Sequence, residues 1–82
     1  MAGYSLNLML ANKTADIKHL GVALGRICIK AGVPVSVVAW EFGVSRQTIY
    51  NWFEGRVTPN NQVAESIKEY IATLKHEHKH GI

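Results

Sequence analysis

Three glycines divide this chain into short segments, and that division limits its fold more than any other feature. Gly32, Gly43 and Gly55 each follow a run in which apolar residues recur at spacings of three and four. This spacing is typical of amphipathic helices, and a glycine directly after such a run favours the left-handed turn that ends a helix. The valine-rich run 34–42 would also suit a strand, but the chain offers no partner strand. We therefore predict an all-α domain of four helices, or of five if the apolar N-terminal segment is also helical.

The predicted helices are bounded by capping residues and by these glycines. Thr14 or Asp16 is expected to cap the first helix, and Ser45 is expected to cap the third. Gly21 and Gly25 lie one turn apart inside the first helix. Because glycine lowers helix stability, we expect another helix to approach closely there. The predicted helices span residues 16–31, 34–42, 46–54 and 58–75.

The composition of the 82-residue chain fits one small domain and excludes several kinds of site. Cys28 is the only cysteine, so an internal disulfide and a cysteine-based zinc site are excluded, and we expect a buried thiol. We find no nucleophile–base pair, carboxylate pair or phosphate loop, and therefore expect neither an enzyme nor a cofactor. The first residues lack the features of a targeting signal, so we expect a cytoplasmic protein. A net charge of +3 permits nucleic-acid binding without requiring it.

The spacing around Gly43 predicts a helix-turn-helix over residues 34–54. Ala39 precedes this glycine by four positions, and Ile49 and Trp52 follow it by six and nine. A small residue at the first position lets the second helix cross, and the two later residues hold that helix to the core. The second helix must then turn its polar side chains outward, namely Arg46, Gln47, Tyr50 and Asn51.

This outward set has the chemistry that reads base pairs in the major groove of DNA. Arginine can grip both acceptors of guanine, and glutamine or asparagine can pair with adenine through two hydrogen bonds. Tyr50 could rest on a thymine methyl group or bond a phosphate, and Ser45 with the free amides of the helix start could bind a phosphate. A merely solvated helix face usually carries glutamate and lysine, as the last predicted helix does. We therefore expect double-stranded DNA as the partner.

The segment PVSVVAWEFGVSRQTIYNWFEGRVTPN, residues 34–60, resembles the helix-turn-helix of the Cro/cI repressor group, also called the XRE family. The matching residues are Ala39, Gly43, Val44, Ser45, Ile49 and Trp52, followed by EGRVTP. The resemblance implies a small lambda-repressor-like domain. It also implies a transcriptional regulator of phage or bacterial origin, a repressor that occupies an operator.

The resemblance assigns roles to single residues. The family's base-reading positions correspond to Arg46, Gln47, Thr48 and Asn51. The loop that usually touches phosphates corresponds to Arg56, Thr58, Asn60 and Asn61. Family members often have a glutamine at the position of Val35, where it bonds the DNA backbone, and we expect Ser36 to replace this anchor in part.

Two features leave the mode of association open. Trp40 occupies a position that is usually exposed in the family, so either the N-terminal arm or a second copy is expected to cover it. Glu41 and Glu54 cancel the charges of the two arginines in this segment, so we expect weak binding by one copy and a homodimer or tandem binding on DNA. The alternative function is an interaction module that binds RNA polymerase or another regulatory protein through Trp40 and the arm.

The chain divides into three parts. Residues 1–13 form an apolar arm or short helix, residues 14–75 the helix-turn-helix domain, and residues 76–82 a histidine-rich tail. In the tail, His76 and His80 would lie one turn apart on a helix, but no supporting partner is evident. We expect a frayed, pH-sensitive tail and no metal site.

Overall fold

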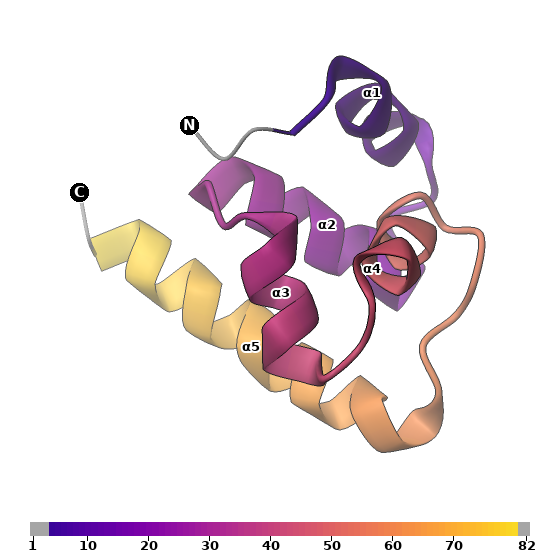
Figure 1. Ribbon diagram of the computed structural model, residues 1–82. Coiled ribbons are helices and arrows are strands. Elements are labelled where there is room, and N and C mark those ends of the chain that lie inside the picture. Colours follow the sequence, from indigo (N-terminus) through magenta and orange to yellow (C-terminus); the bar gives the residue numbers. More distant parts are fainter. Residues whose placement is uncertain (1–3, 81–82) are drawn as a thin grey trace.

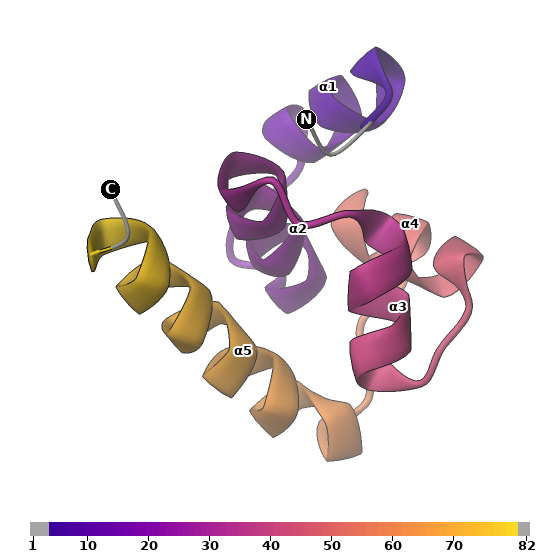
Figure 2. The same ribbon diagram turned by 60° about the vertical axis from the view of Figure 1, so that its left-hand side comes forward.

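The computed structural model describes residues 4–80, and the side chains of residues 4–77. Within this range the chain forms five α-helices and no strand, so the all-α prediction is confirmed. Helix α2 lies at the centre, with α5 along one side and α1 and α4 on the other (Figure 1, Figure 2). The helices are α1 (Leu6–Thr14), α2 (Leu20–Ala31), α3 (Val35–Phe42), α4 (Arg46–Phe53) and α5 (Asn61–His80).

The core forms where α2 meets α4 and α5. The apolar side of α2 buries Leu24 and Cys28 completely, as the periodicity predicts. Ile49 of α4 and Ile67 of α5 belong to the same cluster and are also fully buried. Burial of a leucine or isoleucine side chain contributes about 1.5–3 kcal/mol. The three helices are therefore held together mainly by apolar contact.

Each of the three dividing glycines adopts the left-handed conformation that ends a helix. The φ angles are 75° at Gly32, 65° at Gly43 and 78° at Gly55. At the middle turn, the amide of Val44 donates to the carbonyl of Ala39 at 3.0 Å, which satisfies a carbonyl at the end of α3. A residue with a Cβ atom is strained in this conformation, so these positions favour glycine. The predicted turns are confirmed.

Gly21 and Gly25 lie where α2 touches its neighbours most closely. A Cβ atom built on Gly21 would lie 2.6 Å from the carbonyl oxygen of Trp52. One built on Gly25 would lie 2.7 Å from Cγ of Phe53 and 2.5 Å from Nδ2 of Asn12. These distances leave no room for a side chain. The predicted close approach is confirmed, and both α4 and α1 take part in it.

The predicted start of the first long helix is wrong. Helix α2 begins after His19, whose Nδ1 atom accepts from the amide of Gly21 at 3.1 Å. Asp16 instead forms a turn before the helix, where its carboxylate accepts from the amide of Lys18 at 2.9 Å. Thr14 belongs to the end of α1. The side chain of Asp16 therefore stabilises a local turn in place of a helix start.

The last helix also begins later than the sequence predicts. Asn60 precedes α5, and its Oδ1 atom accepts from the amide of Val63 at 3.1 Å, which caps the helix. The predicted start at Thr58 and Pro59 falls in the connecting loop. At the other end α5 continues through His80, because no glycine or proline interrupts it, so this part of the predicted frayed tail is helical. The last two residues lie outside the described range.

The N-terminal arm is a short helix, α1, that packs against α2 and α4. Ser5 caps it, because its Oγ atom accepts from the amide of Leu8 at 3.1 Å. Asn12 is buried, and its side-chain amide donates to the carbonyl oxygens of Val22 and Phe53. Of the two descriptions that the sequence allows, arm or short helix, the helix is the one observed.

Candidate nucleic-acid interface

Helices α3 and α4 form a unit in which the second helix has a fixed orientation. Three residues join the two helices. Ser45 caps α4 as predicted, because its Oγ atom accepts from the amide of Thr48 at 3.1 Å. Ala39 is buried between the helices, and Ile49 and Trp52 are buried beneath α4, which confirms the predicted inward positions. The packing of these residues decides which side of α4 faces solvent.

The opposite side of α4 carries the side chains predicted to read bases. Arg46 and Gln47 are exposed, whereas Tyr50 and Asn51 are half-buried. The Nε2 atom of Gln47 donates to Oδ1 of Asn51 at 3.2 Å, so the two amides form a connected pair along the helix. Exposure at Arg46 and Gln47 agrees with their predicted outward positions. Tyr50 is partly turned inward, because its ring packs against the core.

Thr48 lies at the start of α4 and points back toward the cap. Its Oγ1 atom lies 3.0 Å from Oγ of Ser45, and one of the two hydroxyls donates to the other. Ser45 also accepts from the amide of Thr48, so both hydroxyls are engaged at the helix start. The structure therefore brings one predicted base-reading residue next to a predicted phosphate contact.

A cleft of about 490 Å³ opens beside the exposed side of α4. Arg46, Gln47 and Tyr50 line one wall of it. Ser36 at the start of α3 and Arg56 in the loop after α4 line it as well, so five of the predicted site residues share this cleft. The far wall is the start of α1, which the sequence does not associate with the site. Its lining residues there are Tyr4, Ser5, Asn7 and Leu8.

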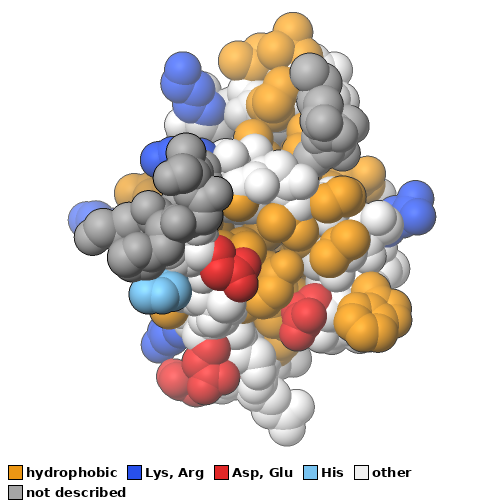
Figure 3. Space-filling model, turned by 90° about the vertical axis from the view of Figure 1, so that its left-hand side faces the viewer, with side chains coloured by type: hydrophobic (Ala, Val, Ile, Leu, Met, Phe, Trp, Pro, Cys, Tyr) orange, Lys and Arg blue, Asp and Glu red, His pale blue; other side chains and the backbone are white. Residues whose placement is uncertain are grey.

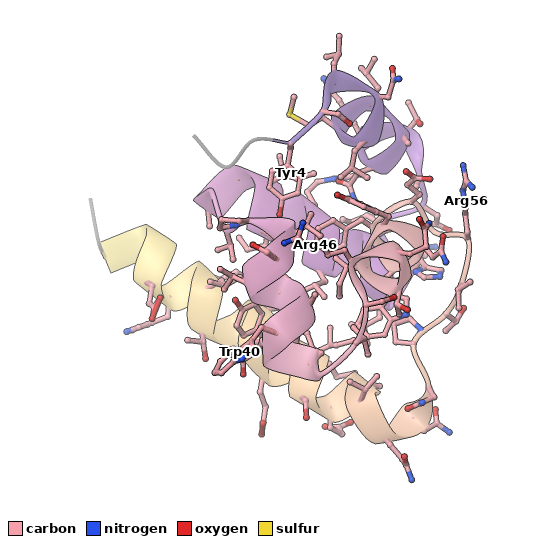
Figure 4. The ribbon with its side chains drawn as sticks, viewed as in Figure 1. Tyr4, Trp40, Arg46 and Arg56 are labelled. Carbon is pink, nitrogen blue, oxygen red and sulfur yellow. The ribbon has the colours of Figure 1, made fainter. Side chains whose placement is uncertain are left out.

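Tyr4 lines the cleft and bonds to the segment that follows α2. Its hydroxyl donates to the carbonyl oxygen of Val33, just after the turn that ends α2. Burial raises the pKa of Tyr4 above its ordinary value, so the phenol keeps its proton and remains a donor. Figure 4 shows Tyr4 and Arg46 near each other, with Trp40 farther along α3. No local spacing in the sequence signals this arrangement.

The predicted phosphate-binding residues of the loop do not form a single group. Arg56 lines the same cleft as the base-reading candidates. Thr58 lies elsewhere, with its Oγ1 atom 3.3 Å from Nε2 of His19. Asn60 caps α5 and lines a second groove, between α3 and α5, and Asn61 is exposed in the first turn of α5. Of these four residues, Arg56 alone lies beside the base-reading candidates.

Arg56 is paired with a carboxylate of the same loop. Its Nε atom lies 2.9 Å from Oε1 of Glu54, whose side chain is only 20% exposed. Glu54 therefore cancels the charge of Arg56, as expected, and does so through a direct ion pair. Arg46 makes no ion pair with the described residues. It therefore carries the uncompensated positive charge of the cleft.

Trp40 remains uncovered by the described part of the chain. It is 82% exposed, and Val37, one turn earlier on α3, is 45% exposed. The expectation that the N-terminal arm covers Trp40 is wrong for the described part of the arm, residues 4 onward. Hydrogen bonds from Tyr4 and Asn12 hold that segment against α2 and α4. Contact with a second copy stays a prediction.

Comparison with known proteins adds no family assignment. No protein-family model, curated protein or solved structure matches this chain. In the described part of the chain, no helix is both long and apolar enough to span a membrane. Among the same residues, no group of three or more His, Cys, Asp or Glu side chains is placed to hold a metal ion. The candidate site is therefore defined by its own geometry.

Proposed function

We propose that this chain is a lambda-repressor-like helix-turn-helix protein that binds double-stranded DNA sequence-specifically and represses transcription at an operator. One observation carries the proposal. Helix α4 buries its apolar side, while Arg46, Gln47 and the amide of Asn51 stand on the opposite side. A helix side that only faces solvent does not require these residue types. The exposed side of α5, for comparison, carries Glu65 and Lys68.

In this proposal the first turns of α4 enter the major groove. Arg46 offers a fork of donors that fits the two acceptors of guanine. The hydrogen bond from Gln47 to Asn51 leaves the carbonyl oxygen of Gln47 as an acceptor and the amino group of Asn51 as a donor. Adenine presents the complementary pattern in the major groove, an amino donor beside a ring acceptor. The amide pair is thus arranged to read adenine.

Phosphate groups would lie at the N-terminal ends of α3 and α4. Ser36 is exposed in the first turn of α3, and Ser45 and Thr48 carry hydroxyls at the start of α4. Free backbone amides at a helix start attract anions. Arg56 could bind a phosphate only after its ion pair with Glu54 breaks. Its contribution is therefore smaller than that of an unpaired arginine.

The modest charge of this surface implies that affinity depends on more than one copy. The chain has a net charge of +3, and one of the two arginines in the cleft is already paired. Each phosphate that a cation neutralises adds to affinity through counterion release, so few such contacts give weak binding. We propose that at least two copies occupy neighbouring sites on the DNA.

Selection of bound sequences from a random duplex pool tests this proposal. The expected result is enrichment of a short motif that contains guanine and adenine, with an affinity that falls as salt rises. Recovery of random sequences, or binding unaffected by salt, would refute it. The control variant carries Arg46→Ala and Gln47→Ala, which leave the buried side of α4 intact. It is expected to enrich no motif.

The exposed tryptophan favours one alternative, an interaction module that binds RNA polymerase or another regulatory protein. Trp40 is not among the residues that line the cleft, so it offers a separate apolar contact. Binding through such a side chain depends less on salt than binding through phosphates does. Three results together would favour the interaction module: the chain captures purified RNA polymerase regardless of salt, Trp40→Gln abolishes this capture, and no DNA motif is enriched.

A further inference from the structure

Helix α3 presents an uncovered apolar surface that is bordered by acidic groups. Trp40 and Val37 are exposed, and Glu41 is exposed beside them; we call these three residues the α3 face. Glu41 also lines, with Glu69, the groove of about 570 Å³ between α3 and α5, and no lysine or arginine lines that groove. Figure 3 shows a band of hydrophobic side chains on this side of the molecule, with acidic side chains set into it.

Helix α1 presents a second uncovered apolar surface, and its charge is opposite. Leu6 and Leu10 lie one turn apart and are 65% and 52% exposed. Lys13 follows them on the exposed side, while Leu8 and Asn12 are buried on the other. We call Leu6, Leu10 and Lys13 the α1 face. Helix α1 contains no acidic residue, so this face is purely basic.

We propose that these two faces bind each other, so that the α1 face of one copy docks on the α3 face of the next. Contact between two α1 faces would bring two lysines together, and contact between two α3 faces would bring two glutamates together. The mixed contact joins opposite charges as well as apolar surfaces. It also offers the indole ring of Trp40 to the ammonium group of Lys13, a favourable cation–π arrangement.

Such a contact uses two different surfaces and is therefore heterologous. It leaves one α1 face and one α3 face free at the two ends of a pair, so copies add in one direction. Leu6, Leu10 and Trp40 do not line the cleft beside α4, so the contact uses side chains other than the DNA-binding candidates. The inference is therefore independent of the proposed DNA binding.

Two variants of the full chain remove one face each. Leu6→Gln with Leu10→Gln removes the apolar part of the α1 face, and Trp40→Gln removes that of the α3 face. All three residues are more than half exposed, so both variants should fold, which thermal unfolding by circular dichroism verifies. Sedimentation velocity over a wide concentration range measures self-association. The parent chain is expected to associate. The association affinity of each variant is expected to be lower than that of the parent by at least about tenfold.

Mixing the two variants gives the sharpest result, because a heterologous contact needs one intact face from each partner. The Trp40→Gln chain keeps its α1 face, and the chain with Leu6→Gln and Leu10→Gln keeps its α3 face. Their mixture is expected to form a one-to-one pair that grows no further with concentration. A mixture without pairs, or a parent chain that stays monomeric throughout, would overturn the proposal.

Val57→Gln is the matched control, since Val57 is 48% exposed but lies in the loop after α4, on neither face. It is expected to associate like the parent. Charge reversal gives an independent readout: Lys13→Glu and Glu41→Lys should each weaken association, and the two together in one chain should restore it. If Trp40→Gln abolishes association while the α1 variant does not, the contact is a two-fold one between α3 faces and the proposal is wrong.

Discussion

The side-chain amide of Asn12 donates to the main-chain carbonyl of Phe53 at 2.7 Å, which ties α1 to the end of α4 across 41 positions of sequence. The same amide reaches the carbonyl of Val22 at 3.1 Å, so one side chain joins three helices. Arg26 completes the junction, because its Nη2 atom donates to the carbonyl of Asn12 at 2.8 Å. Helix α1 is therefore held at a defined position beside the candidate DNA-binding helix.

Asn12→Ala is expected to lower the free energy of unfolding by about 2–3 kcal/mol, because two buried carbonyls lose their donor. Urea-induced unfolding followed by circular dichroism measures the change. Asn7→Ala is the matched control, since Asn7 is exposed on the same helix, and its effect should stay within about 0.5 kcal/mol. Equal effects of the two substitutions would contradict the role of the buried amide.

Alkaline pH is expected to destabilise the protein through Cys28. Burial raises the pKa of this thiol from an ordinary value of 9.0 to about 12. The unfolded chain releases the proton above pH 9, whereas the folded chain keeps it, so the folded state binds more protons in this range. As the pH rises through this range, the free energy of unfolding should fall by ~1.4 kcal/mol per pH unit.

Cys28→Ala isolates this contribution, because it removes the titrating thiol. Urea unfolding between the ordinary pKa values of cysteine, 9.0, and tyrosine, 10.0, should then show a shallower pH dependence than in the parent. The comparison concerns the slope, so the stability lost with the smaller side chain does not affect it. At higher pH the buried Tyr4, whose pKa is also raised, is expected to lower the free energy of unfolding further. An unchanged slope in the alanine variant would rule out the thiol as the cause.

Arg46→Ala is expected to weaken binding to the selected motif by about 1–3 kcal/mol and to relax the preference at one base pair, because a bidentate contact to guanine is lost. Fluorescence anisotropy with the selected duplex and its single-base variants measures both effects. Lys68→Ala is the control, because it removes an equal charge from the exposed side of α5. If Arg46→Ala weakened binding to every duplex equally, the arginine would be a phosphate contact and not a base reader.

Glu54→Gln is expected to tighten DNA binding and to steepen the logarithmic salt dependence by about one, because it frees Arg56 for a phosphate. Its effect on stability should be below about 1 kcal/mol, since the arginine is largely exposed. Salt titration of binding to a random duplex measures the slope. Glu65→Gln is the control, because it removes an equal charge paired with Lys68 at 3.4 Å on α5. If the Glu54→Gln variant showed the same salt dependence of DNA binding as the parent chain, Arg56 would contact no phosphate.

Local signals explain why the middle of the fold is predictable from the sequence. Gly32, Gly43 and Gly55 act through the conformation of their own backbone, and Ser45 caps α4 with its own side chain. Such signals need no information about distant residues. The ends of α2 and α3 and both ends of α4 therefore follow from the sequence to within one residue.

The starts of α2 and α5 are less predictable, because more than one nearby residue is able to cap them. Asp16 and Thr58 have side chains suited to a helix start, yet His19 and Asn60 take that role. Asp16 is used in a turn with Lys18, and Thr58 lies against His19. Which candidate caps the helix depends on these neighbouring contacts, and they are not visible as a pattern of residue types.

The cleft is not predictable, because its walls come from distant segments joined through main-chain carbonyls. Tyr4 donates to the carbonyl of Val33, and Asn12 to that of Phe53. Every residue has a carbonyl, so no residue type marks the acceptor. The exposed side of α4, by contrast, follows from the helical positions of its buried residues. The residue pattern therefore predicts the candidate DNA-binding helix α4, whereas it does not predict the α1 wall of the cleft beside it.

Gly25 and Asn12 restrict which side chains either position can accept. A side chain at position 25 would collide with the amide of Asn12 and with the ring of Phe53. Without that amide, two buried carbonyls would lose their donor and α1 its attachment. The two positions are therefore expected to change together or not at all.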